Sequence, residues 1–185
     1  NNELLERKMF LERAAKLIEY FRDDERPFVM AKVIGYDATQ WSKVIFINRG
    51  TDHKIEKNLS VMTDAGVVGH IVHASSRSSK VLLITDSRSA IDSLFQGTRK
   101  SGITIGTGEE ICEMTFVPIS AKVRIGDKVI SSGLGGVFPK GLMVGKVVNI
   151  VKQNQELFQV IKVAPSVNLS HLEEVVVLLP SKEEE

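Results

Sequence analysis

The amino-acid sequence predicts a mainly β protein, in which two small six-stranded antiparallel β-barrels follow an N-terminal, coiled-coil-like α-helix. Three observations lead to this fold class. Apolar residues recur every seven positions in the first 26 residues, the apolar period changes to two from residue 28 onward, and part of the later pattern occurs twice. A period near 3.5 is typical of a helix, and a period of two is typical of a strand.

Residues 1–26 have the apolar spacing of an amphipathic helix. Charged residues occupy the other face, and Pro27 ends the helix because proline lacks the N–H that a helix interior needs. The predicted apolar stripe consists of Leu4, Leu11, Ala14, Ile18 and Phe21. Such a stripe either packs on the chain's own domain or forms a seam between two copies. Its start at the first residues favours the seam.

Short runs rich in valine, isoleucine and threonine predict the strands, and clusters of glycine, aspartate, asparagine and serine separate them. The runs are 29–34, 43–47, 67–72, 81–85, 103–107, 111–117, 128–131, 144–151, 158–163 and 174–179, and 87–96 is interpreted as a strand after a turn. No convincing helix separates these runs, which favours a barrel or sandwich over an α/β fold.

Part of this β region occurs twice. Residues 54–62 align with 122–130, and residues 66–72 align with 141–148. A repeated strand pattern predicts two barrels built on one plan. We expect the first barrel to comprise residues 29–88 plus 170–180 and the second to comprise residues 89–167. We expect the terminal strand to return and close the first barrel, because residues 29–88, with the repeated segment 54–62 counted as a strand, supply one strand fewer than six.

Length and composition exclude several classes of function. The 185 residues include 24 basic and 23 acidic residues, so bulk positive charge does not support nucleic-acid binding. A single cysteine, Cys112, excludes an intramolecular disulfide, and its alternation with Met114 and Phe116 predicts a small buried core residue. No run is long enough to span a membrane. Because the chain does not begin with methionine, we expect it to be part of a longer protein.

The sequence contains no recognisable catalytic, cofactor-binding or metal-binding constellation. A trypsin-like protease would need a serine in a Gly-Asp-Ser-Gly-Gly context, which is absent. His70 and His73 would face opposite sides of a strand, so they do not form a metal site. We expect the histidines to lie at the surface or at strand ends. Trp41 lies in a polar connection, where a large aromatic either caps a barrel or contacts a partner.

The most distinctive segment is residues 132–141, which we call the glycine loop. Its candidate structural or partner-binding residues are Gly133, Gly135, Gly136, Val137, Phe138, Pro139 and Gly141. Glycines allow positive φ and close backbone approach. The loop lies between two strands and lacks a Lys-Ser/Thr pair, so it is not a phosphate-binding loop. The first copy of the repeat connects the same strands with residues 63–65 alone. The longer loop therefore serves either packing between the barrels or contact with another chain.

These motifs resemble those of the MreC family of bacterial rod-shape-determining proteins. The glycine loop, preceded by residues 125–129, is similar to the hallmark segment of that family, and residues 66–72, 80–86 and 172–178 match in the same order. The resemblance implies a helix and two small barrels outside the membrane. It also implies a single membrane span upstream of residue 1, which places this fragment on the extracytoplasmic side of the cell membrane.

The resemblance implies a non-enzymatic scaffold that maintains bacterial cell shape by organising peptidoglycan synthesis in the cell-wall elongation machinery. The implied partners are a second copy or larger self-assembly, MreD, the MreB filament, RodA and a class B penicillin-binding protein, with no cofactor. Two alternatives stay open. One is a periplasmic or extracellular adaptor of the membrane-fusion or secretion type, against which the complete glycine loop argues. The other is an undetected hydrolase with a trypsin-like double barrel.

Overall fold

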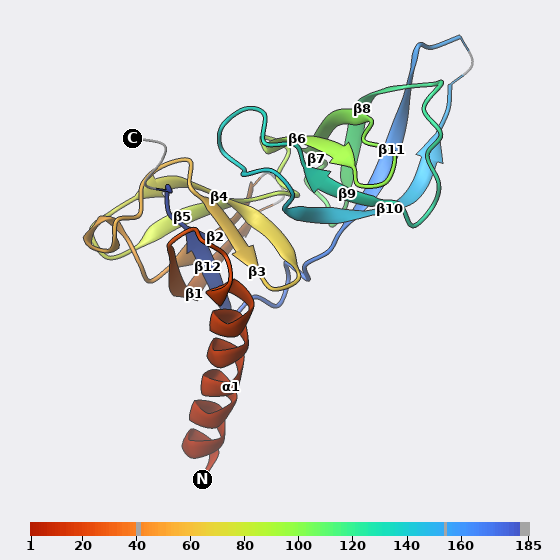
Figure 1. The fold of residues 1–185 in the computed structure, drawn as a ribbon. Coiled ribbons are helices and arrows are strands. Elements are labelled where there is room, and N and C mark those ends of the chain that lie inside the picture. The colour runs from red at the N-terminus through yellow and green to blue at the C-terminus, as the bar shows by residue number, and fades with distance from the viewer. Residues whose placement is uncertain (40–41, 154, 182–185) are drawn as a thin grey trace.

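The computed structural model describes residues 1–39, 42–153 and 155–181, and Figure 1 shows its fold. The elements in this part of the chain are α1 (Asn2–Arg22), β1 (Phe28–Thr39), β2 (Ser42–Ile47), a 3₁₀ turn (Thr51–His53), β3 (Ser60–Thr63), β4 (Gly66–Ala74), β5 (Ser79–Leu83), β6 (Ala90–Phe95), β7 (Ser101–Gly106), β8 (Cys112–Pro118), β9 (Lys128–Ser131), β10 (Met143–Val151), β11 (Phe158–Pro165) and β12 (Glu174–Leu178).

The strands form two closed antiparallel barrels of six strands each, which confirms the predicted fold class. The first barrel has the order β1-β12-β3-β4-β5-β2, and the second has the order β10-β11-β8-β7-β6-β9. The last strand of the chain lies in the first barrel, where Val177 pairs with Val29 on β1 and with Val61 on β3. Within the described residues, closure leaves neither sheet with an open edge.

Both barrels follow one strand order. The hairpin β3–β4 and the following β5 correspond to β9–β10 and β11 in the aligned segments of the sequence. Further around each barrel, β2 and β1 occupy the places of β8 and β7, and β12 occupies the place of β6. In the second barrel this strand directly precedes β7 in the sequence, whereas in the first barrel it comes from the opposite end of the chain.

All residues of β12 are buried because both of its faces are covered. Val175 and Val177 belong to the core inside the first barrel. Val176 and Leu178 face the other way and belong to a cluster that includes Leu17 of α1 and continues into the core of the second barrel. Because side chains alternate along a strand, β12 contributes one face to the core of the first barrel and the other face to the packing outside that barrel.

The C-terminal half of α1 packs on the first barrel. Ala14, Leu17 and Phe21 are buried, and the Arg13 guanidinium donates to both carboxylate oxygens of Glu174 at 2.8 and 3.1 Å. The N-terminal half of α1 extends away from both barrels (Figure 1). No helix in the described residues combines the length and apolar character that a membrane span requires.

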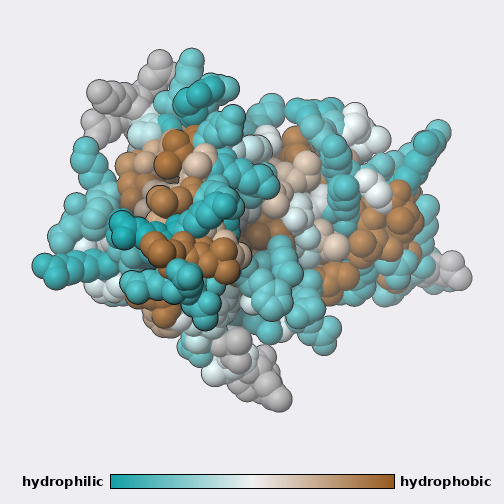
Figure 2. Space-filling view, turned by 90° about the horizontal axis from the view of Figure 1, so that it is seen from below, coloured by the Kyte–Doolittle hydropathy of each residue, from teal (hydrophilic) through white to brown (hydrophobic). Residues whose placement is uncertain are grey.

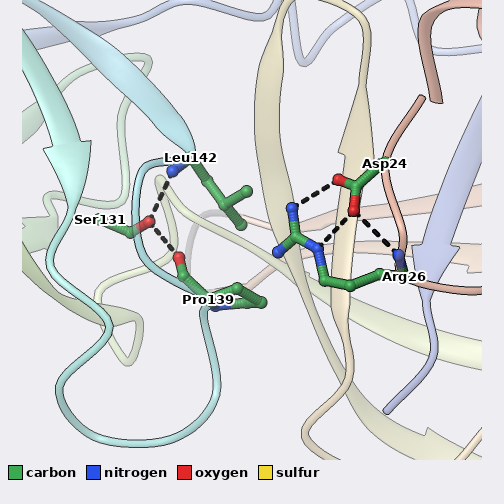
Figure 3. A network of polar contacts seen from close by, with 5 residues as sticks. All are labelled: Asp24, Arg26, Ser131, Pro139 and Leu142. Carbon is green, nitrogen blue, oxygen red and sulfur yellow. Dashed lines mark hydrogen bonds and ion pairs between the residues drawn. The ribbon is translucent and has the colours of Figure 1, made fainter. Parts of the chain in front are cut away.

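The helix ends at Arg22, four residues earlier than the sequence suggests. Acidic side chains oppose the dipole at a helix C-terminus, and Asp24 instead accepts hydrogen bonds from the backbone N–H and the guanidinium of Arg26 (Figure 3). These donations hold the pKa of Asp24 below its ordinary value. The chain then turns into β1.

The connection between the barrels is fixed by the buried side chain of Asp86. Its carboxylate accepts the backbone N–H groups of Lys43 at 2.7 Å and of Arg88 at 2.9 Å, and the Arg88 guanidinium donates to both oxygens at 2.9 Å. Burial raises the pKa, but these donors outweigh it and hold the pKa of Asp86 at about 2. The linker is thus tied to the first barrel through β2.

Candidate functional site

The glycine loop connects β9 to β10 and needs its glycines for backbone geometry. Gly133, Gly135, Gly136 and Gly141 have φ angles of 82°, 84°, 76° and 90°. Other residues adopt this left-handed region only with strain, because a Cβ atom would approach the carbonyl oxygen. The glycines therefore determine the path of the loop, as the sequence suggests.

Ser131 closes the base of the loop (Figure 3). Its hydroxyl donates to the Pro139 carbonyl and accepts the Leu142 N–H at 2.9 Å. The backbone of Ser131 also accepts the N–H of Gly141 at 2.9 Å. The two ends of the loop are thereby held together, so the loop projects as one unit from the second barrel.

The loop reaches the first barrel through Phe138. This side chain is only 6% exposed, and its ring packs edge to face on His70 of β4 with centroids 5.8 Å apart. Phe138 belongs to the apolar cluster that includes the core of the second barrel, and Val137 packs against this cluster. Leu134, at the tip of the loop, is exposed. Figure 1 shows the teal loop extending from the second barrel toward the first. One segment therefore combines packing between the barrels with an exposed tip.

His70 is half-buried, so the expectation of a surface or strand-end histidine is wrong for this residue. Its Nδ1 atom is buried with no hydrogen-bond partner among the described residues. Burial, and to a smaller extent the charge of Lys57, lower the pKa of His70. The Phe138 ring, which comes from a distant part of the sequence, is one of the groups packed on His70.

A second candidate site lies at one end of the second barrel. We call it the aromatic surface, and it consists of exposed apolar side chains that are neighbours across β8 and β11. They are Phe116 (59% exposed), Ile119 (40%), Leu157 (78%) and Phe158 (45%). The rings of Phe116 and Phe158 lie 5.9 Å apart, and the Ile119 N–H donates to the Leu157 carbonyl. Figure 2 shows apolar side chains gathered on the second barrel, at the right.

A β-bulge turns Phe116 out of the core. Val117 pairs with Gln159 and Met114 pairs with Ile161, so two residues of β8 oppose Val160 alone. Phe116 takes the extra position with φ at 58°, a conformation that is strained for an aromatic residue. The simple alternation that placed Phe116 in the core is therefore wrong. A bulge depends on pairing with β11, which the sequence of β8 does not reveal.

The predicted stripe on α1 divides into two parts. Ala14 and Phe21 are buried in the chain's own fold, together with Leu17, so these two residues pack within the chain. Leu4, Leu11 and Ile18 remain exposed at a spacing of seven residues. Only this exposed part of the stripe is free to contact another copy.

The remaining candidates do not form a reactive site in the described residues. Cys112 is buried as expected, its thiol donates to the Ile84 carbonyl, and burial raises its pKa to about 12. A thiol with this pKa is a poor nucleophile near neutral pH. The described residues contain no cluster of histidine, cysteine and carboxylate side chains that could hold a metal ion. Trp41 lies outside the described residues.

The fold and these features define a class of protein, a double β-barrel preceded by a helix, whose candidate sites are contact surfaces. A family model described as "Rod shape-determining protein MreC, barrel core" matches residues 33–179. The chain belongs to the MreC family.

Individual relatives agree with this assignment. The cell shape-determining protein MreC of Escherichia coli K12 is 30% identical over 183 residues, which cover 96% of this chain and 50% of that protein. The crystal structure of MreC from Pseudomonas aeruginosa, 26% identical, superposes with a TM-score of 0.80 over 83% of this chain and 99% of that one. The chain spans about half the length of the curated relatives it matches.

A further solved structure is a complex between penicillin-binding protein PBP2 and MreC from Helicobacter pylori. Its matching chain is 20% identical, with a TM-score of 0.62 over 83% of this chain and all of that one. At this identity the likeness establishes a shared fold.

Proposed function

We propose that this chain is the extracytoplasmic part of a membrane-anchored scaffold of the cell-wall elongation machinery. In this role it maintains cell shape by organising peptidoglycan synthesis and catalyses no reaction itself. Membership of the MreC family supports the proposal. The single observation that carries the proposal is the aromatic surface. Its apolar side chains are exposed to solvent in this chain, and a protein partner bound there would bury them.

The aromatic surface has the chemistry of a protein-contact site. Large aromatic and aliphatic side chains provide most of the binding energy when a partner removes them from water. Phe116 in addition holds a strained backbone conformation while its ring stays exposed. Strain that brings an apolar ring into solvent gives no benefit to folding, which favours a role in binding.

We infer that the partner at this surface is a class B penicillin-binding protein, because a relative forms a complex with penicillin-binding protein PBP2. The test uses biolayer interferometry with the extracytoplasmic region of that partner immobilised. It compares the binding of the 185-residue chain with the binding of its F116A/F158A variant. We expect the variant to bind at least about 30-fold more weakly, since two contact aromatics each contribute about 1–2 kcal/mol.

Leu134→Ala is the matched control, because Leu134 is similarly exposed but lies on the glycine loop. Binding by this control should stay within about twofold of the parent chain. Loss of binding in Leu134→Ala, with F116A/F158A unaffected, would place the contact on the glycine loop and contradict the proposal.

We further propose that the chain self-associates through the exposed part of the α1 stripe, namely Leu4, Leu11 and Ile18. Residues seven apart lie on one helix face, and pairing two such faces removes them from water. L11D/I18D should abolish association at high concentration, because a charge buried without a partner costs several kcal/mol. Analytical ultracentrifugation measures this, with E12A/E19A as the control. A parent chain that stays monomeric at hundreds of micromolar would refute the proposed seam between two copies.

MreD, MreB and RodA are further proposed partners of the chain.

A further inference from the structure

A groove separates the two barrels on the side where the β11–β12 connection crosses between them. Its volume is about 410 Å³, within the range of sites that bind small molecules. The groove is lined by β1, β2 and β5 of the first barrel and by the turn between β7 and β8 of the second. The end of β11 and the β11–β12 connection also line it, with residues 164, 165 and 167–170. Buried Val44, Leu83 and Val167 form apolar parts of its lining. None of these residues belongs to the aromatic surface or the glycine loop.

Tyr36 adds an aromatic side chain to the lining, and its position is fixed. Its hydroxyl donates to the Leu172 carbonyl at 3.0 Å and accepts the Leu172 N–H at 2.8 Å. The side chain is nevertheless exposed. An exposed ring that is already immobilised loses little entropy when a ligand packs on it, so Tyr36 is suited to binding.

The second barrel contributes two carboxylates to the groove, those of Glu109 and Glu110. Neither carboxylate takes part in a hydrogen bond or ion pair within the described ranges 1–39, 42–153 and 155–181. Among the described residues that line the groove, Lys43 has the only basic side chain. The groove therefore combines an apolar lining, a fixed aromatic ring and an excess of negative charge.

We propose that this groove binds an extended peptide segment of a protein partner, in which an arginine or lysine is flanked by apolar side chains. The cation would pair with Glu109 and Glu110 and lie near the electron-rich face of Tyr36, and the apolar neighbours would cover Val44, Leu83 and Val167. An acidic segment would meet the two carboxylates as like charges. A wholly apolar segment would remove them from water without compensation.

The test uses a defined probe, the acetylated and amidated tripeptide of leucine, arginine and leucine. Its citrulline counterpart has nearly the same shape without the charge. Both are titrated into the ¹⁵N-labelled 185-residue chain, and amide shifts are followed by NMR. We expect shifts in residues 164–170 and around Tyr36, with the arginine peptide bound at least about fivefold more tightly than the citrulline peptide.

The variant E109Q/E110Q should remove that difference while the amide spectrum shows both barrels folded. The matched control is E56Q/E156Q, which neutralises two exposed glutamates that do not line the groove. This control should keep the preference for the arginine peptide. The proposal is overturned if groove residues show no shifts at millimolar peptide, if both peptides bind equally, or if E109Q/E110Q keeps the preference.

Discussion

The two barrels share one strand order but differ in what covers them. The first barrel carries α1 and Phe138 on its outside, and both faces of β12 are buried. The second barrel leaves Phe116, Leu157 and Phe158 exposed. The repeated pattern thus determines how each barrel closes. The helix and the glycine loop, which lie outside that pattern, determine which faces remain available to a partner.

The matched hairpins show the difference at a single position. In the first barrel, a short turn joins β3 to β4, and the Ala65 N–H donates to the Thr63 hydroxyl at 3.2 Å. In the second barrel, residues 132–142 make the same connection and reach across to His70. Gly66 and Gly141 occupy the aligned place in the two hairpins, and both have positive φ. A barrel can therefore close without the longer loop, whose added contact joins the two barrels.

Phe138→Ala removes this contact and should give the largest loss of stability. The side chain is buried between the barrels, so the change leaves a cavity and should cost about 3–5 kcal/mol in the free energy of unfolding. Leu134→Ala, at the exposed tip of the same loop, should cost less than about 0.5 kcal/mol. Urea unfolding measures both. If both variants lose less than about 0.5 kcal/mol in the free energy of unfolding, the glycine loop does not hold the two barrels together.

Gly66→Ala and Gly141→Ala compare the aligned glycines directly. A Cβ at Gly66 would lie 2.2 Å from the Ser166 hydroxyl and 2.5 Å from the Met143 carbonyl, whereas a Cβ at Gly141 would meet open space. We expect a cost of about 3 kcal/mol at Gly66, from overlap and backbone strain together, against about 1 kcal/mol at Gly141 from strain alone. Equal losses of thermal stability would show that the contact between β3–β4 and β10 is unimportant.

Asp86→Asn tests the linker that sets the barrels side by side. The folded pKa of about 2 lies below the ordinary value, so the carboxylate stabilises the fold fully above about pH 4, and this stability is lost as the pH falls through 2. The contribution is about 2 kcal/mol. The parent chain and Asp86→Asn should therefore differ by this amount at pH 7 and converge near pH 2. Asp52→Asn, at an exposed position, should not differ from the parent by more than about 0.5 kcal/mol.

Local patterns in the sequence were sufficient to predict the helix, most of the strands and the two closed barrels, but β3 (Ser60–Thr63) was not among the predicted runs. The spacing of apolar residues depends on burial of one face, and that relation holds for most strands of both barrels. The glycine loop was also identifiable, because four glycines in one short segment have few structural uses other than positive φ.

Features that depend on contacts between distant segments could not be predicted in this way. The outward turn of Phe116 depends on the bulge opposite β11, and His70 packs on Phe138 from the glycine loop. The stripe on α1 is continuous in sequence, but the first barrel covers only Ala14 and Phe21 of it. In each case the outcome depends on which distant segment packs against the residue. The spacing of apolar residues along the sequence does not give this information.

His70 gives the smallest and most specific test of the two-barrel comparison. The strand register places His70 opposite Ser60 on β3, as it places Lys146 opposite Lys128 on β9. Lys146 is exposed, whereas the Phe138 ring packs on His70. Burial, and to a smaller extent the charge of Lys57, lowers the pKa of His70.

Because this pKa is lowered, the uncharged ring of His70 is favoured in the folded chain. Its contribution to stability is complete above about pH 6.5 and is lost as the pH falls below that value. NMR titration of the His70 side chain should show a midpoint below the ordinary value for histidine, and Phe138→Ala should raise that midpoint toward the ordinary value. A midpoint at the ordinary value in the parent chain would show that the glycine loop does not shield His70 from water.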